Sequence, residues 1–221
     1  DLGITIDFAP VVDASDQDDD TVIGDRSFSN DPQKVTEYAG AYARGLLEAG
    51  ITPVLKHFPG HGHASGDSHL GGVTTPPLSE LMTNDVVPYR ELTKLPGTAV
   101  MVGHMQVPGL TGTDPASLTP AAYKLLRDGT PYGGSPFNGV VFTDDLSSMG
   151  AINQNYTVAQ AALKALQAGA DIALWITTDE VPGVLDALEA AVKTGGLDMK
   201  NVDDSVLRVA AIKGKSSRCG G

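Results

Sequence analysis

Short apolar runs alternate with amphipathic stretches along most of the chain. In residues 32–48, Val35, Tyr38 and Tyr42 recur at helical spacing, and Pro32 suits the first turn of a helix. Short, continuous apolar runs elsewhere are typical of buried strands. The pattern predicts strands over residues 4–13, 51–57, 97–104, 138–144 and 170–176, and helices over residues 32–48, 79–94, 120–127, 157–168, 181–194 and 201–213.

The alternation of strands and helices indicates an α/β fold. Consecutive strands separated by helices favour parallel pairing through right-handed crossovers, and strands that are apolar throughout are typical of sheets covered on both faces. Five such units are too few to close an eight-stranded (β/α)8 barrel, so the pattern resembles a barrel entered partway through. An open doubly wound sheet fits the same pattern and stays an alternative.

Polar residues collect where the predicted strands end. In both candidate architectures the carboxyl ends of parallel strands form the edge at which binding and catalytic groups gather. We therefore expect the functional residues at this edge. The polar residues at the strand ends are Asp13, Lys56, His57, His104, Asp144, Asp145, Thr177 and Thr178.

Chain length, net charge and the lengths of the apolar runs exclude several classes of function. A chain of 221 residues can bury a substantial core within one domain. The formal net charge of -12 at pH 7 argues against a nucleic-acid partner or an anionic membrane surface, because both favour basic patches. No apolar run approaches the roughly 20 residues of a membrane-spanning helix.

The two ends of the chain leave its cellular location open. Cys219 is the single cysteine, so the chain forms no internal disulfide, and it lies in a predicted flexible tail at 215–221. The chain opens with Asp1 rather than methionine, which is compatible with a processed or removed upstream segment. Cytoplasm, cell envelope and secretion all stay open.

A loop rich in histidine follows the second predicted strand. Residues 56–69 contain Lys56, four of the chain's five histidines and Asp67, separated by glycines and a proline. Asp67 lies two residues before His69, so its carboxylate can hold one imidazole nitrogen and leave the other for proton transfer. The structural alternative is a loop fixed by local hydrogen bonds.

A metal site is a second interpretation of this loop. Histidine and aspartate are ordinary zinc ligands, although no recognised zinc spacing such as H-E-x-x-H is present. A metal ion would repel Lys56, whereas sugar hydroxyls would accept hydrogen bonds from it. The candidate ligands for a metal-dependent hydrolase are His57, His61, His63, Asp67 and His69.

Two adjacent aspartates follow the fourth predicted strand. A carboxylate at the tip of a buried strand is costly unless it has partners or a task. We assign the capping of the next turn to Asp145 and the functional role to Asp144. Arg26, in the loop after the first strand, is a further candidate for a functional role. The structural alternative is that Arg26 forms an ion pair with Asp25 or with the acidic stretch 16–20.

Three segments resemble glycoside hydrolase family 3, and they are most similar to its bacterial β-N-acetylglucosaminidase branch, the NagZ-type enzymes. The likeness covers nearly all of the chain, and the K-H-F-P-G-H-G motif is its most specific part. The segments are residues 4–12 with Gly24–Phe28, Lys56–Gly62 with Asp67–His69, and Phe142–Leu146.

The resemblance implies a retaining exo-β-N-acetylglucosaminidase that needs no metal or organic cofactor. It implies a covalent glycosyl-aspartate on Asp144 as nucleophile, with Asp67 and His69 as the acid/base pair. It further implies a carbohydrate substrate in cell-wall turnover, with muropeptides and chitin fragments both open. The positions that it matches to binding of the N-acetylglucosamine ring are Arg26, Lys56 and His57.

The resemblance also implies a (β/α)8 TIM-type barrel of which residues 1–214 lack roughly the first three βα units. In the family an early aspartate binds the distal hydroxyls of the sugar, and nothing in this chain stands in for it. We expect a missing N-terminal segment or a second chain to complete the barrel. A sugar-binding barrel fragment without catalytic activity is the remaining alternative.

Overall fold

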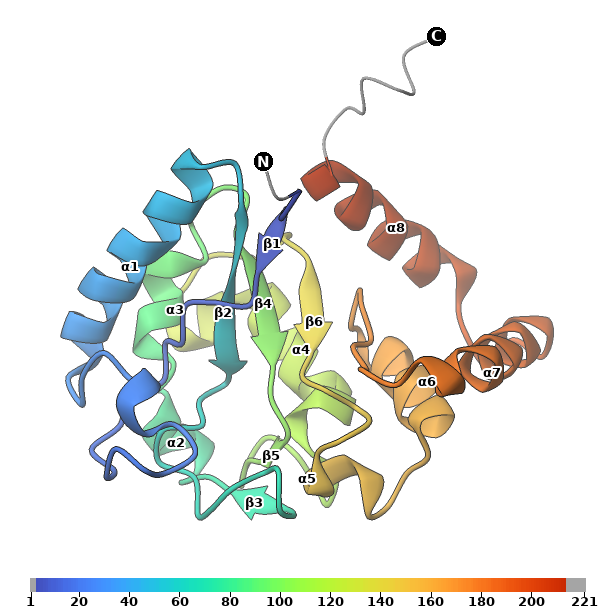
Figure 1. Cartoon of the computed structure of the whole chain (residues 1–221), viewed down its shortest axis with the longest axis horizontal. Helices are drawn as coiled ribbons and strands as arrows, with labels where there is room; N and C mark the ends of the chain where they lie inside the picture. The colour runs from blue at the N-terminus through green and yellow to red at the C-terminus, as the bar shows by residue number, and fades with distance from the viewer. Residues whose placement is uncertain (1–2, 214–221) are drawn as a thin grey trace, which may run out of the picture.

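Four parallel strands form a curved sheet at the centre of the molecule, as Figure 1 shows. The computed structural model describes residues 3–213, so the predicted tail at 215–221, with Cys219, lies outside the described residues. Every neighbouring pair in the sheet is parallel. The strands in spatial order are β1 (Ile6–Asp7), β2 (Thr52–Phe58), β4 (Ala99–Val102) and β6 (Val141–Thr143).

The first predicted strand is shorter than the sequence indicates, and the last, over the described residues 170–176, is not formed. Beyond β1, the first segment returns to β2 at one bridge, Val11 to Lys56, because Pro10 has no amide hydrogen for a continuous ladder. The prediction of a strand over 170–176 is wrong. That segment meets β6 at a single bridge, Phe142 to Ile172, and has no strand on its other side within the described residues.

Eight α-helices are present within residues 3–213. The predicted helix over 79–94 is interrupted, because residues 82–86 form a turn that carries the buried Asp85 and Pro88 then opens a new helix. None of the helices in the described region has the length and apolar character required to cross a membrane. They are α1 (Pro32–Glu48), α2 (Leu78–Leu81), α3 (Val87–Leu92), α4 (Pro120–Asp128), α5 (Gly150–Asn153), α6 (Val158–Ala168), α7 (Val181–Lys193) and α8 (Met199–Lys213).

Local sequence signals explain where the longer helices begin. The Asp31 carboxylate accepts a hydrogen bond from the Gln33 amide at 2.9 Å, and Pro32 occupies the first turn of α1. At the start of α6, Thr157 and Gln160 form a reciprocal capping box. These caps fix the point at which the chain leaves each loop.

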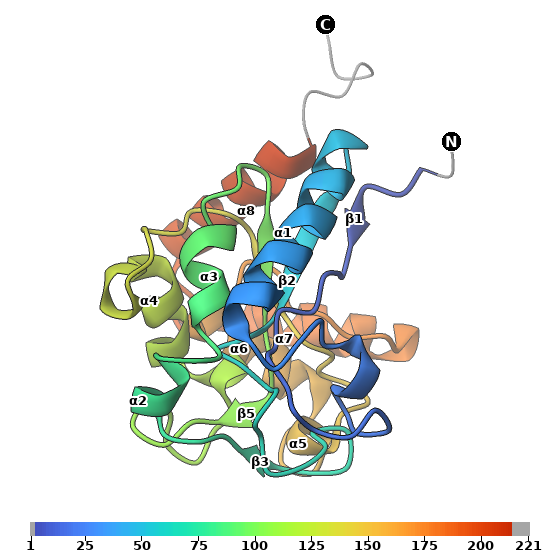
Figure 2. The ribbon, with the colours of Figure 1, turned by 90° about the vertical axis from the view of Figure 1, so that its left-hand side faces the viewer.

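The two faces of the sheet have different neighbours. Alternate strand residues such as Leu55, Val100 and Val141 point into the main core beneath the helices, and Figure 2 shows α1 and α3 in front of β2. The intervening residues, such as Met101 and Phe142, form a smaller cluster on the other face. Helices mainly on the outer face of a curved parallel sheet match the predicted partial (β/α) barrel and differ from a doubly wound sheet.

The carboxyl ends of the strands carry the long loops. In Figure 1 the arrowheads of β2, β4 and β6 point to one end of the molecule, where α2, α5 and a second small sheet lie. That sheet pairs β3 (Val73–Thr74) with β5 (Met105–Gln106) in parallel, and the sequence did not predict it. The histidine-rich loop lies between β2 and β3, at the edge where we expected the functional residues.

A buried aspartate ties the last part of the chain to the sheet. The Asp171 carboxylate, whose side chain is fully buried, accepts hydrogen bonds from Arg127 at 2.6 Å and from the Val141 amide at 2.8 Å. It also accepts bonds from Ser205 at 2.7 Å and Arg208 at 2.9 Å. One side chain thereby joins α4, β6 and α8.

We expect Asp171→Ala to lower the free energy of unfolding by about 3 kcal/mol, because it removes a fully buried carboxylate that holds two partly buried guanidinium groups. Urea unfolding followed by circular dichroism measures this change. The control is Asp128→Ala, which removes an exposed pair with Lys124 at 2.6 Å and should cost about 1 kcal/mol or less. Equal losses in the two variants would contradict this interpretation of Asp171.

Candidate active site

A fully buried carboxylate, Asp13, organises the end of β2. It accepts hydrogen bonds from His57 Nδ1 at 2.7 Å, from the His57 amide at 3.2 Å and from the His61 amide at 2.8 Å. Burial alone would raise the pKa of Asp13, but the charge and hydrogen bond of His57 and the hydrogen bond from the His61 amide hold the pKa below its ordinary value. Asp13 is therefore an ionised anchor for the histidine-rich loop.

The His57 imidazole lies between two carboxylates. Its Nδ1 contacts Asp13, and its Nε2 lies 3.8 Å from Asp144 Oδ2 at the end of β6. Burial would raise the pKa of Asp144, but the charges of His57 and Lys56 and a backbone hydrogen bond from Asp145 hold the pKa below its ordinary value. Asp144 is consequently a carboxylate near neutral pH.

Lys56 supplies positive charge next to Asp144, and Arg26 lies near Lys56. Burial lowers the pKa of Lys56, the nearby Arg26 lowers it further, and Asp144 and Asp13 act in the opposite direction. The peptide bond between Lys56 and His57 is cis. The Arg26 guanidinium donates to the Val22 carbonyl and, within the described residues, pairs with no carboxylate. The expected structural alternative for Arg26, an ion pair with Asp25 or the stretch 16–20, is wrong.

Asp67 and His69 form the pair that the sequence predicts. Asp67 Oδ1 lies 2.6 Å from His69 Nδ1 and accepts the His69 amide at 2.8 Å. Burial would raise the pKa of Asp67, but these hydrogen bonds and the charge of His69 lower it. The His69 side chain is 55% exposed and makes no ion pair with Asp144 within the described residues. The structure thus arranges the predicted site residues in two groups. Lys56, His57 and Asp144 form one group, and Asp67 and His69 form the other.

The candidate metal ligands do not converge. No group of three His, Cys, Asp or Glu side chains within residues 3–213 is arranged to hold a metal ion, so the side-chain positions give no support to the alternative of a shared metal site. Each histidine of the loop has a different polar partner. The pairs are His57 with Asp13, His61 with Ser68, His63 with Asp85, and His69 with Asp67.

Asp145 caps the turn after β6, as predicted. The Asp145 carboxylate accepts hydrogen bonds from the Ser147 amide at 2.9 Å and the Ser147 hydroxyl at 2.7 Å, so it caps the turn after β6. The same carboxylate accepts a bond from the Ser148 hydroxyl. Asp144 takes no part in this turn beyond one bond from the Asp145 amide, which leaves its carboxylate directed at the cluster with His57.

Sequence reasoning assigned no role to Asp13, His104 or Asp85. His104 is buried, and burial lowers its pKa, so it is a neutral ring between Ser117 Oγ at 2.7 Å and the Asp145 carbonyl at 2.9 Å. Asp13 and His104 are the last residues of predicted strands, and this position is the sequence signal that could have identified them as site residues. Asp85 lay inside a predicted helix and carried no such signal.

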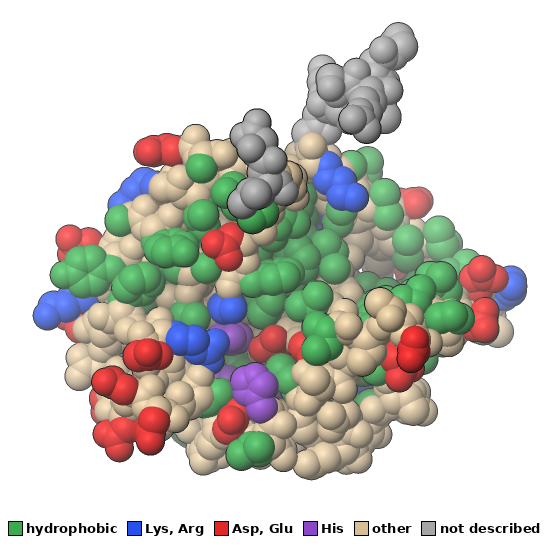
Figure 3. Space-filling view, viewed as in Figure 1, with side chains coloured by type: hydrophobic (Ala, Val, Ile, Leu, Met, Phe, Trp, Pro, Cys, Tyr) green, Lys and Arg blue, Asp and Glu red, His purple; other side chains and the backbone are tan. Residues whose placement is uncertain are grey.

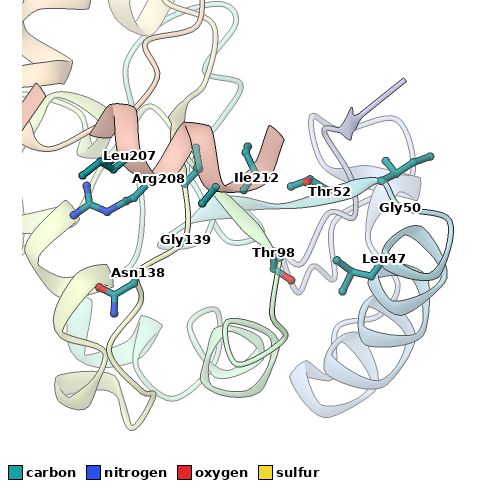
Figure 4. Close-up of a pocket in the computed structure, with 13 residues that line it drawn as sticks. Leu47, Gly50, Thr52, Thr98, Asn138, Gly139, Leu207, Arg208 and Ile212 are labelled. Carbon is teal, nitrogen blue, oxygen red and sulfur yellow. The ribbon is translucent and has the colours of Figure 1, made fainter. Parts of the chain in front are cut away.

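The charged cluster is separate from a large cavity at the opposite ends of the strands. That cavity measures about 700 Å³ and lies at the amino ends of the strands, lined by residues such as Thr52, Thr98 and Leu207 (Figure 4). Arg208 is its one charged lining residue, and Asp171 already binds that side chain. Figure 3 shows histidine, basic and acidic side chains gathered elsewhere, below a strip of hydrophobic side chains. The chemistry therefore belongs to the carboxyl ends of the strands.

Comparison with known proteins identifies relatives along the whole chain. The model of the glycosyl hydrolase family 3 N-terminal domain matches residues 1–212. The beta-hexosaminidase LpqI of Mycobacterium tuberculosis is 65% identical over 219 residues, which are 99% of this chain and 56% of that protein. The chain therefore spans little more than half the length of this curated relative.

Solved structures share the fold. A family 3 glycosyl hydrolase from Mycobacterium smegmatis is 70% identical with a TM-score of 0.95, covering 97% of this chain and 64% of its own. A family 3 beta-N-acetylglucosaminidase from Paenibacillus sp. is 36% identical with a TM-score of 0.88, covering 96% of this chain and 40% of its own. These likenesses confirm the partial barrel.

The His63–Asp85 pair generates a pH prediction. The hydrogen bond from Asp85, against the opposing effect of burial, raises the pKa of His63. A raised folded-state pKa gives stability that is complete below the unfolded value of about 6.5 and is lost as pH rises through the folded-state pKa. We expect the unfolding free energy of the parent to exceed that of His63→Gln by about 1 kcal/mol more at acidic than at alkaline pH. Urea titrations on both sides of neutrality measure this difference, and a constant gap would contradict the assignment.

Proposed function

The chain belongs to glycosyl hydrolase family 3, and we propose that the full-length protein is a retaining exo-β-N-acetylglucosaminidase. Its substrate is a terminal β-linked N-acetylglucosamine, in muropeptides or in chitin-type fragments. The observation that carries the proposal is the ionised Asp144 carboxylate at a strand end, beside Lys56 and His57. The beta-hexosaminidase name of LpqI, at 65% identity, supports the choice of sugar.

The first chemical step forms a bond between Asp144 and the sugar. An Asp144 oxygen attacks the anomeric carbon while the bond to the leaving-group oxygen breaks, and the His69 imidazolium gives that oxygen a proton. The product is a covalent glycosyl-aspartate and a neutral His69. The low pKa of Asp144 supports this role, because a protonated carboxyl group is a poor nucleophile.

The second step releases the sugar. Neutral His69 takes a proton from water, the water oxygen attacks the anomeric carbon, and the bond to Asp144 breaks. Asp67 supports both steps, because its carboxylate holds His69 Nδ1 at 2.6 Å and leaves Nε2 for proton transfer. A histidine and a carboxylate thus take the two roles that most glycosidases give to two carboxylates.

Three side chains are proposed to bind the sugar ring. Lys56 presents a donor next to Asp144, Arg26 lies near Lys56, and His57 is held in place by Asp13. Sugar hydroxyls accept such bonds, and cationic donors strengthen them. The loop from His61 to Gly72 carries His69 and is rich in glycine, and we infer that it closes on the bound sugar to bring the imidazole to the leaving group.

The unfinished barrel suggests how the site is completed. The inner face of the sheet is apolar, with Ile6, Ile172 and Leu174 only partly buried and Ile4 58% exposed. Burying this face against further βα units would be favourable, since apolar area removed from water contributes about 25 cal/mol per Å². We infer that an upstream segment of the full-length protein, or a second chain, packs here and closes the barrel around the sugar.

The nucleophile assignment predicts that Asp144→Asn in the full-length protein lowers kcat on a chromogenic β-N-acetylglucosaminide by about 10³-fold or more, since no bond to the sugar can form. The matched control is Asp145→Asn, which keeps an acceptor for the turn and should retain most of the activity. Wild-type turnover by Asp144→Asn would remove the assignment.

The acid/base assignment predicts that His69→Ala slows cleavage of a sugar leaving group by roughly 10²- to 10⁴-fold. A dinitrophenyl leaving group needs no proton, so kcat/KM for that substrate should change far less. His63→Ala removes another histidine of the same loop and serves as the control, with a leaving-group dependence like that of the parent. Parallel losses on the two substrates in His69→Ala would argue against proton donation by His69.

A further inference from the structure

The histidine-rich loop has a rigid base. The Asp13 carboxylate holds the His61 amide at 2.8 Å, and Ser15 Oγ donates to the Gly62 carbonyl at 3.2 Å. A Cβ atom on Gly62 would lie 1.8 Å from the Ala14 carbonyl oxygen, so the two backbones are in direct contact. His61 therefore has a fixed position relative to the end of β2 and to Asp144.

The far end of the loop is exposed apart from one residue. Asp67 is partly exposed, His69 is exposed, and Leu70 is 78% exposed. Ser68, which lies between Asp67 and His69, is only 2% exposed. The Ser68 hydroxyl lies 3.0 Å from His61 Nε2. This contact is a side-chain link between the rigid base and the segment that carries His69.

The protonation state of His61 decides which of the two side chains donates this hydrogen bond. Burial lowers the pKa of His61, so the ring is neutral, and its buried Nδ1 has no hydrogen-bond partner within the described residues. An unpaired buried acceptor is better tolerated than an unpaired buried donor. The hydrogen is therefore on Nε2, which donates to Ser68 Oγ.

Two backbone contacts hold the same segment from the other side. The Gly150 amide donates to the His69 carbonyl at 2.9 Å, and the Ala151 amide donates to the Ser68 carbonyl at 3.1 Å. These bonds attach the segment to the start of α5 without touching β2. The bond between His61 and Ser68 is the side-chain link from the same segment to the end of β2, where Lys56 and His57 lie beside Asp144.

We propose that His61 and Ser68 are positioning residues that hold the His69 imidazole in register with Asp144. This inference rests on the proposed acid/base role of His69 and adds two residues that act through it. Neither side chain touches the reacting atoms. Their bond restricts the positions that the imidazole can reach when the loop closes on the sugar, so its loss affects proton transfer more than binding or nucleophilic attack.

The test compares two β-N-acetylglucosaminides with the full-length protein, one with a sugar leaving group and one with a dinitrophenyl leaving group. Ser68→Ala should lower kcat/KM for the sugar leaving group by roughly 3- to 10-fold, the effect of one neutral hydrogen bond, and leave the dinitrophenyl substrate unchanged. The control is Ser65→Ala, which removes a hydroxyl of the same loop that accepts the Thr74 amide at 3.0 Å. It should match the parent on both substrates.

A second pair of variants separates positioning from packing. His61→Gln can place an amide N–H where His61 Nε2 lies, so it should recover most of the kcat/KM that His61→Ala loses on the sugar leaving group. The double variant of Ser68→Ala with His61→Ala should be no slower than the slower single variant, because both changes break one bond. Together these results would support the link.

Several results would overturn the proposal. Equal losses on both substrates in Ser68→Ala would indicate a general structural effect, and parent-like rates on both would indicate that the bond has no role. Either result overturns the link alone and leaves the proposed function standing. Absence of any turnover by the unsubstituted full-length protein would overturn the proposed function, and the link with it.

Discussion

The buried carboxylate of Asp13 is the interaction on which the rest of the site depends. It joins the segment after β1 to the end of β2 through His57 Nδ1 at 2.7 Å, and it holds the His61 amide at 2.8 Å. An uncompensated charge at this depth would cost several kcal/mol, so Asp13 is stable there because these donors surround it. In return, it fixes the His57 ring and the base of the loop.

Local charge at the strand ends differs from the charge of the whole chain. The protein carries a formal net charge of -12, yet Asp144 lies beside Lys56 and His57. These neighbours outweigh the desolvation of Asp144 and keep its pKa low, which suits a nucleophile. The same environment lowers the pKa of Lys56, because burial disfavours its charge. Asp144 and Lys56 therefore share one partly desolvated environment at the strand ends.

Sequence reasoning predicted the fold class, the order of the main elements and the Asp67–His69 pair. Each of these rests on local patterns, such as apolar periodicity or a carboxylate two residues from an imidazole. The strand over 170–176 was wrong because a ladder needs neighbours that sequence does not show, and Asp171 fixes that segment through its side chain instead. The links from Asp13 to His57 and from His63 to Asp85 span 44 and 22 residues, so no local spacing could reveal them.

The central claim is that the anchored strand end presents Asp144 to the anomeric carbon of N-acetylglucosamine. The most direct measurement is covalent trapping of the full-length protein with a fluorinated N-acetylglucosaminyl donor that reacts quickly and hydrolyses slowly, followed by mass spectrometry of the digested protein. The account predicts one added sugar per protein, on the peptide that contains Asp144. A label on a different residue, or rapid turnover with inverted product and no covalent adduct, would contradict it.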